Sequence, residues 1–151
     1  MMLTKMTRFG TRAVFDIAYN SSGLPVQVKD IANRQEIPLR FLEQIFNRLK
    51  KADFINSVRG PGGGYELIKD PKEITVGDIV RAVDESLDVV CCVSDSKACD
   101  RADQCPTRPI WQEASRKVKE YFDTVTIADL CEDACKKGIK QDLNHPFEYN
   151  I

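Results

Sequence analysis

The feature that most constrains the fold is a basic amphipathic segment that runs directly into a glycine-rich turn. In PLRFLEQIFNRLKKA, residues 38–52, apolar residues recur at helical spacing and basic and polar residues lie opposite them. In FINSVRGPGGGYELIK, residues 54–69, two short strand-like runs flank one proline and four glycines. Because glycine adopts turn conformations that other residues avoid, the pattern predicts a helix followed by a β-hairpin with a projecting tip.

Further helical patterns complete the plan of the first half. Residues 7–21 carry apolar side chains at helical spacing, and residues 28–35 repeat the pattern more weakly. Thr75 with Asp78 forms a capping pattern ahead of residues 76–84. Three short helices followed by a hairpin predict a winged helix-turn-helix, a mainly α fold with a small β-hairpin as the wing.

The outer side of the third predicted helix has the chemistry of DNA recognition. Arg40 and Arg48 suit guanine and Gln44 suits adenine in the major groove, whereas Glu43 repels phosphate and suits the cytosine amino group. Arg59, at the base of the glycine turn, would meet the DNA backbone or the minor groove. We predict that these five residues contact DNA. The alternative is a small helical domain with solvated arginines.

Charge is distributed unevenly along the chain. Residues 1–60 hold ten Lys/Arg and five Asp/Glu, a net charge of +5. Residues 61–151 hold twelve and eighteen, a net charge of −6. This asymmetry favours a first half that faces a polyanion, although modest local imbalance is common in proteins of other function.

The cysteines call for an explanation other than stability. A chain of 151 residues is long enough to bury a core without disulfides. It has no signal-peptide pattern and no run of roughly 18 apolar residues, so we expect a cytoplasmic protein without membrane contact. Four of the six cysteines lie in CCVSDSKACDRADQC, residues 91–105. In a reducing compartment, such a cluster indicates metal ligands or a redox centre.

The sequence after the cysteines returns to a helical pattern. From residue 109 an apolar stripe follows an otherwise charged helix, and one small domain leaves part of this stripe without a partner. A second capping pattern, from Thr126 to Asp129, predicts a short helix that ends near Gly138. The stripe consists of Ile110, Ala114, Val118, Tyr121, Phe122 and Val125.

Long runs of the sequence resemble one family. VKDIANRQEIPLRFLEQIFNRLKKADFINSVRGPGGGYELIKD, ITVGDIVRAVDES and three spaced cysteines are similar to the IscR/NsrR family of iron-sulfur transcription regulators, and most of all to its IscR members. The resemblance covers roughly residues 1–130. It implies a winged-helix domain, a cluster-binding loop, and a long helix that crosses to a second subunit. Such a homodimer would bind double-stranded DNA at a palindromic operator.

The resemblance also divides the chain. The expected parts are a winged-helix domain (1–85), a cysteine-rich cluster-binding loop (86–108), a dimerisation helix with a short C-terminal helix (109–138) and a mobile tail (139–151).

Three cysteines occupy the places of the family's cluster ligands: Cys92, Cys99 and Cys105. Six and then five residues separate them, one more than in the common IscR loop, and a flexible loop absorbs this difference. The IscR resemblance favours a 2Fe-2S cluster, whereas three cysteines with an unusual fourth ligand also suit 4Fe-4S.

The fourth ligand does not follow from the resemblance. Where IscR has a histidine, this chain has Arg108, whose guanidinium stays protonated, and Arg8 stands where NsrR-type proteins have an acidic ligand. His145, the only histidine, lies in the tail and is typical of a solvated residue. The remaining candidates are cysteines, each of which is also consistent with a packing role: Cys91, Cys131 and Cys135.

The resulting hypothesis is a DNA-binding regulator, a repressor of iron-sulfur cluster biogenesis genes, that senses cluster status. One alternative keeps DNA binding but makes the cysteines a thiol-redox or nitric oxide sensor. Another is a zinc-stabilised adaptor that binds protein, although zinc sites favour closer cysteine pairs. The sequence contains no nucleophile-base pair, carboxylate dyad or nucleotide loop, which argues against an enzyme.

Overall fold

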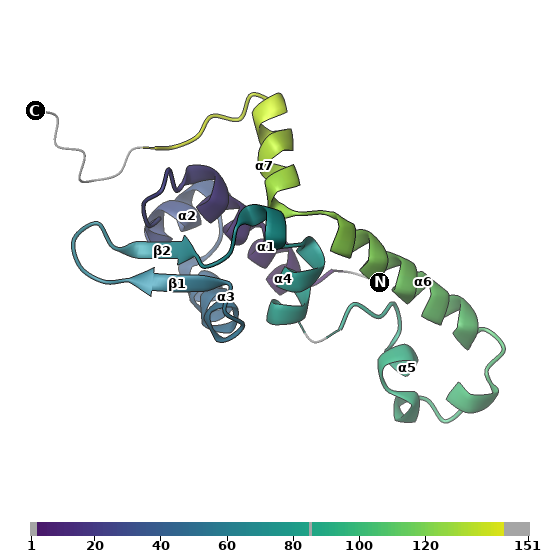
Figure 1. The fold of residues 1–151 in the computed structure, drawn as a ribbon. Helices are drawn as coiled ribbons and strands as arrows, with labels where there is room; N and C mark the ends of the chain where they lie inside the picture. The colour runs from purple at the N-terminus through teal and green to yellow at the C-terminus, as the bar shows by residue number, and fades with distance from the viewer. Residues whose placement is uncertain (1–2, 85, 144–151) are drawn as a thin grey trace, which may run out of the picture.

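The computed structural model describes residues 3–84 and 86–143, and a helical head with a small hairpin carries one long projecting helix (Figure 1). In chain order the elements are α1 (Lys5–Asn20), α2 (Val28–Gln35), α3 (Leu39–Lys51), β1 (Ile55–Val58), β2 (Gly64–Leu67), η1 (Pro71–Glu73), α4 (Val76–Val83), α5 (Cys91–Ser94), η2 (Ser96–Ala98), η3 (Ala102–Gln104), α6 (Arg108–Thr124) and α7 (Ile127–Lys136). The mainly α fold with a two-stranded antiparallel wing is confirmed.

The head is organised around α1, which packs on α2, α3, α4, α7 and β2. Buried apolar side chains from these elements form one core. Each fully buried Leu, Ile or Phe contributes roughly 1.5–3 kcal/mol, so this core is the main source of the head's stability. The core consists of Ala13, Val14, Ile17, Val26, Ile31, Ile37, Leu42, Ile45, Phe46, Leu49, Phe54, Ile55, Ile74, Ile79, Val83 and Ile127.

The amphipathic pattern of α3 determines how this helix lies in the head. Its apolar stripe, Leu42, Ile45, Phe46 and Leu49, is completely buried. The Phe46 ring lies 4.4 Å from the ring of Tyr65 on the wing, measured between centroids. Because the stripe is fixed against the core and the wing, the polar side of α3 must face solvent.

The wing is a regular antiparallel hairpin whose base is fastened to the chain before α2. Ile55 pairs with Leu67 and Val58 with Gly64. Val26 exchanges two backbone hydrogen bonds with Tyr65, of 2.9 and 2.8 Å. A Cβ atom on Gly64 would lie 2.4 Å from the Val26 carbonyl oxygen, so this close approach requires glycine.

Two helix starts fasten the far end of α6 to the head. Thr75 and Thr126 each make a capping box, and they pair with each other in an isolated β-bridge. Val76 N–H donates to the Val125 carbonyl (2.8 Å), and Ile127 N–H donates to the Ile74 carbonyl (2.9 Å). The end of α6 is therefore attached to the start of α4, while the rest of α6 extends away (Figure 1).

The segment after α7 begins on the head. The Tyr19 hydroxyl donates to the Ile139 carbonyl at 2.6 Å, and Asp142 N–H donates to the Asn20 side chain at 2.8 Å. Arg34 joins the Asp142 carboxylate to buried Asp16, with distances of 2.9 and 2.6 Å. These contacts attach residues 139–142 to the ends of α1 and α2. The division of the chain at residue 139, where we expected a mobile tail to begin, stays a prediction.

Two further expectations concern the C-terminal tail and contact with a membrane. His145 and the remainder of the predicted tail lie outside the described residues. Over residues 3–84 and 86–143, no helix combines the length and the apolar character that crossing a membrane requires.

Candidate nucleic-acid interface and cysteine loop

The first two turns of α3 carry three of the predicted DNA contacts. Arg40, Glu43 and Gln44 are all exposed there. The guanidinium carbon of Arg40 lies 5.2 Å from the centroid of the Phe41 ring, which steadies the long side chain on the helix. This end of α3 therefore presents a cation, a carboxylate and an amide to solvent, a set that can read base edges.

Arg48 differs from the other predicted contacts. Its Nη1 donates to the backbone carbonyl of Val83, at the end of α4. One donor of this guanidinium is therefore used inside the head, where it connects α3 to α4. The prediction that Arg48 contacts DNA stays a prediction, and the structure adds a structural role that the sequence pattern did not indicate.

Arg59 follows β1 directly and is exposed at the glycine turn. The first strand of the hairpin packs on α3, so the wing and the helix belong to one unit. Together they place cations on two elements that a DNA duplex can contact at once, as in winged helix-turn-helix proteins.

The cysteine segment is a chain of short helical turns rather than the featureless loop expected from its lack of apolar periodicity. Cys91 begins α5, Cys92 follows it, Cys99 ends the η2 turn, and Cys105 lies just ahead of α6. All six thiols of the chain are free. Cys92 and Cys105 are half-buried, whereas Cys91 and Cys99 are exposed.

The surroundings of Cys105 favour the ionised form of its thiol. Its sulfur lies 3.2 Å from the Thr107 hydroxyl. This hydroxyl, the backbone N–H groups of Thr107 and Arg108 and the charge of Arg101 lower the pKa of the Cys105 thiol. Hydrogen bonds to a thiolate favour the form that binds metals and reacts as a nucleophile.

The entry to the loop is attached to the side of α6. Lys119 makes a 2.7 Å ion pair with Asp88, whose side chain is only 8% exposed. Burial opposes ionisation of Asp88, but hydrogen bonds from Lys119 and Ser86 hold its carboxyl pKa below the usual value. Val89 N–H donates to the hydroxyl of buried Ser115 at 3.0 Å.

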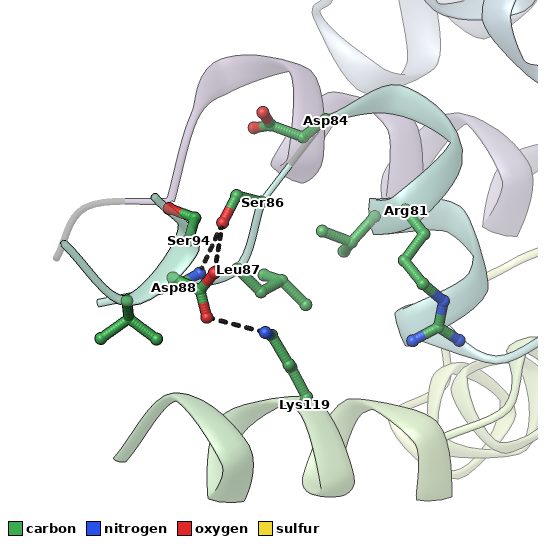
Figure 2. A pocket seen from close by; sticks show the side chains of 9 residues that line it. Arg81, Asp84, Ser86, Leu87, Asp88, Ser94 and Lys119 are labelled. Atoms are coloured by element: carbon green, nitrogen blue, oxygen red, sulfur yellow. Dashed lines mark hydrogen bonds and ion pairs between the residues drawn. The ribbon is translucent and has the colours of Figure 1, made fainter. Parts of the chain in front are cut away.

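These contacts border a cleft of about 430 Å³ between α4, the loop and α6. Figure 2 shows Lys119 reaching from α6 to Asp88, with Arg81 on the α4 side of the cleft. The sequence did not single out Lys119 or Ser115, because one looks like any charged surface residue and the other like a neutral helix position. Their partners lie 31 and 26 residues away along the chain.

The donor set fits a thiolate-bound metal group, but the described loop does not bring it together. Within residues 3–84 and 86–143, no three His, Cys, Asp or Glu side chains are close enough to hold a metal ion. Four free thiols on one loop of short turns, including those of Cys92, Cys99 and Cys105, have the chemistry that iron-sulfur clusters require. A cluster on Cys92, Cys99 and Cys105 would therefore require the loop to close further.

The other cysteines lie in different surroundings. Cys91 is exposed, which excludes the buried packing role considered for it. Cys131 packs against the core, and burial raises the pKa of its thiol, whereas Cys135 is exposed. Both lie on α7, beyond the far end of α6 from the loop (Figure 1). The 17 residues of α6 span about 25 Å, so neither thiol reaches the loop of the same chain.

Most of α6 is uncovered. Among its residues, only Ser115 is buried. Ile110, Trp111 and Tyr121 are large apolar side chains with exposed fractions of 58%, 41% and 64%. A long helix with an uncovered apolar side is typical of one that pairs with another protein surface.

Comparison with known proteins identifies the family. Residues 3–133 match the Rrf2 family, described as "Iron-dependent Transcriptional regulator". The chain belongs to the Rrf2 family. The IscR transcriptional regulator of Serratia proteamaculans is 42% identical over 130 residues, which cover 86% of this chain and 79% of the relative. The Escherichia coli protein of the same name is equally similar, at 42% over 130 residues.

Solved Rrf2-like structures share the fold. The T. potens IscR structure superposes with a TM-score of 0.73 at 32% identity, covering 94% of each chain. The CymR global cysteine regulator of B. subtilis has a TM-score of 0.72 at 29% identity, covering 87% of this chain and 97% of its own. These relatives are transcriptional regulators rather than enzymes, and the predicted class of DNA-binding regulator is confirmed.

Proposed function

We propose that this Rrf2 protein is a cytoplasmic homodimeric repressor that carries an iron-sulfur cluster on Cys92, Cys99 and Cys105. Its target genes would be those of iron-sulfur cluster biogenesis, as the similarity to IscR suggests. A 2Fe-2S cluster is the favoured form. When bound, such a cluster supplies a centre that responds to iron supply and oxidation.

The observation that carries the proposal is the loop itself. Four free cysteines follow the head on a segment of short turns. Two of them adjoin the start of α6, because the Cys92 carbonyl accepts a hydrogen bond from Arg108 and Cys105 lies three residues before Arg108. Lys119 and Ser115 attach the loop entry to α6, and the end of α6 is bonded to α4. A change in the loop can therefore reach the head through α6. Cluster and operator would then affect each other's binding reciprocally.

The dimer is supported by the uncovered apolar side of α6. A second copy that packs along this helix would bury Ile110 and Tyr121, which one chain leaves in water. Two-fold symmetry would then place the two α3 helices about one DNA turn apart, which suits a palindromic operator.

Anaerobic isolation followed by iron analysis tests the cluster. The wild-type protein should be coloured and hold about two or four irons per subunit. Cys92→Ala, Cys99→Ala and Cys105→Ala should each lose the cluster. Cys91→Ala tests a fourth ligand from the same chain, whereas Cys131→Ala and Cys135→Ala test one supplied by the second subunit. Mössbauer spectra distinguish the two cluster types. Protein that stays colourless after reconstitution, or holds zinc alone, would refute the proposal.

Operator titrations at several salt concentrations test the DNA face. Arg59→Ala should weaken binding similarly across operator variants and lower the salt slope by about one. Lys137→Ala, which removes an exposed cation at the end of α7, should change neither quantity. Equal operator affinity and equal salt dependence in the two variants would show that the wing does not contact DNA.

A thiol-redox sensor is the second candidate, favoured by the lowered pKa of the Cys105 thiol. A solved relative, Staphylococcus aureus CymR, is described in an "oxidized form", with a TM-score of 0.70 at 26% identity, covering 87% of this chain and 97% of its own. Iron-free protein whose operator affinity changes on peroxide treatment, and is restored by dithiothreitol, would favour this function over cluster sensing.

A further inference from the structure

Arg108, the first residue of α6, bonds to both ends of the cysteine loop. Its backbone N–H donates to the Cys105 carbonyl at 3.3 Å. Its side-chain Nε donates to the Cys92 carbonyl at 3.1 Å. One residue therefore joins two chain segments whose cysteines are thirteen positions apart.

The chemistry of Arg108 suits a support and excludes a ligand. Its guanidinium stays protonated and has no lone pair to give to a metal. A hydrogen bond from a charged donor is stronger than a neutral one, and the planar guanidinium fixes its direction. Because the side chain is half-buried, water competes less for this bond than at an exposed position.

The rest of the loop shows why this bond matters. The Asp88–Lys119 and Val89–Ser115 contacts hold the chain on α6 before Cys92. Cys105 lies three residues before Arg108 and is held at the start of α6 by the short connection and by the backbone bond from Arg108. α5 also packs on α6. Among the described residues, however, the Arg108 bond is the hydrogen bond that attaches the Cys92 carbonyl to α6, and without it the arc that carries exposed Cys99 would be longer and looser.

We infer that Arg108 is a positioning residue that holds the Cys92 and Cys105 segments together, so that two metal-binding thiols are placed before Cys99 closes on the group. The inference rests on the proposed cluster-binding function for its purpose, but the positioning itself is a property of the metal-free chain. Hydrogen bonds that orient the residues holding a metal typically change metal affinity by roughly 10- to 100-fold.

The loop offers a matched control in Arg101. Arg101 is exposed and its charge acts on the Cys105 thiol, so Arg101→Ala also removes one cation from the loop. It leaves the bond between Arg108 and Cys92 intact. A purely electrostatic role of the loop cations would make Arg101→Ala and Arg108→Ala alike, whereas positioning affects only the second.

The first experiment uses metal-free full-length protein in which Cys91, Cys99, Cys131 and Cys135 are replaced by serine. Dibromobimane becomes fluorescent when it bridges two neighbouring thiols, so its rate reports how often Cys92 and Cys105 meet. Arg108→Ala should slow bridging about tenfold, and Arg108→Lys should restore part of the rate. Arg101→Ala should slow bridging by less than about twofold, because it removes only a minor contribution to the lowered pKa of the Cys105 thiol. Equal rates in all four proteins would overturn the inference.

The second experiment uses the reconstituted holoprotein with all its cysteines. Iron loss to a chelator should be about tenfold faster in Arg108→Ala than in wild type or Arg101→Ala, and the EPR spectrum of the reduced cluster should change only in Arg108→Ala. Thermal unfolding of the metal-free proteins should coincide, which separates positioning from a folding defect. Unchanged iron loss and EPR spectrum in Arg108→Ala would also overturn the inference.

The two experiments separate the inference from the proposed function. If wild-type protein takes up no cluster but bridging still depends on Arg108, the proposed function fails and the positioning role stands. If the cluster forms and is retained equally by all variants, with equal bridging rates, the proposed function stands and the positioning role fails.

Discussion

The head and the region that follows it differ in how much of their surface they bury. Every member of the apolar core lies between residues 13 and 83, apart from Ile127 on α7. Of the described residues from 86 to 124, only Leu87, Ala102 and Ser115 are buried. The head is therefore stable through its own packing, whereas the loop and α6 expose the thiols and apolar side chains that a ligand or a second subunit can cover.

The largest expected effect separates the two regions by stability. Phe46→Ala removes a fully buried ring from the head and should lower the free energy of unfolding by about 3–5 kcal/mol. Cys99→Ala in the metal-free loop should change it by less than about 0.5 kcal/mol. Urea unfolding of both metal-free proteins measures the difference. Comparable losses would mean that the loop belongs to the same cooperative core as the head.

The next effect tests whether α6 is covered by a second copy. Tyr121→Lys places a charge on the apolar side of α6 and should raise the dimer dissociation constant about 100-fold. Gln112→Lys, on the opposite side of the same helix, should leave it within about threefold. Analytical ultracentrifugation measures both constants. Equal dissociation of the two variants would assign the dimer contact to another surface.

The attachment of the loop to α6 should have a smaller, pH-dependent effect. At neutral pH, Asp88→Asn should lower the free energy of unfolding by about 1–2 kcal/mol, because it weakens the bond to Lys119. Native contacts lower the Asp88 pKa, so their stabilisation is fully present above the ordinary aspartate pKa of about 3.9 and is lost as the pH falls through the native pKa.

The difference in the free energy of unfolding between wild type and Asp88→Asn should therefore be constant down to about pH 5 and should shrink below about pH 4. Asp100→Asn, an exposed carboxylate in the same loop, should stay within about 0.5 kcal/mol of wild type. Urea unfolding at several pH values provides the measurement. A gap that grows towards acid pH would contradict the assigned ion pair.

The smallest effect compares thiols of the two regions. Cys105 should be alkylated faster than Cys131 near neutral pH, because hydrogen bonding lowers the pKa of the first thiol and burial raises that of the second. Thr107→Val should slow alkylation of Cys105 by about threefold and leave Cys131 unchanged. Peptide mass spectrometry of briefly alkylated metal-free protein gives both rates.

The two regions were also unequally predictable from sequence. The buried stripe of α3 and the presence of the hairpin follow from local patterns, namely a helical period in residues 38–52 and a glycine turn between strand-like runs. The cysteine segment has no such period, so its short turns were read as a loop, although α5, η2 and η3 lie within it. Short turns depend on capping contacts and on the surface below them, which local periodicity does not encode.

The candidate site also has a part that the sequence predicts and a part that it does not. The chemistry of its members was predicted from the sequence, from residue type and position for Arg59 and from the family resemblance for the three cysteines. The partners of long side chains could not be predicted from the sequence. The pattern placed Arg48 on the DNA-reading side, and one of its donors lies on the carbonyl of Val83. Arg108 was notable only because it cannot be a ligand, and the structure shows it bonded to Cys92.

The sequence by itself therefore determined that this chain forms a winged helix-turn-helix head, a thiol-bearing loop and a long helix with an apolar stripe, because periodicity, capping and glycine placement act over a few residues. Only the tertiary structure decided how these parts are connected: α4 to the end of α6, Lys119 to Asp88, and Arg108 to Cys92. Such contacts join residues distant in the chain. They depend on distances that exist only after the core has fixed the relative positions of the helices.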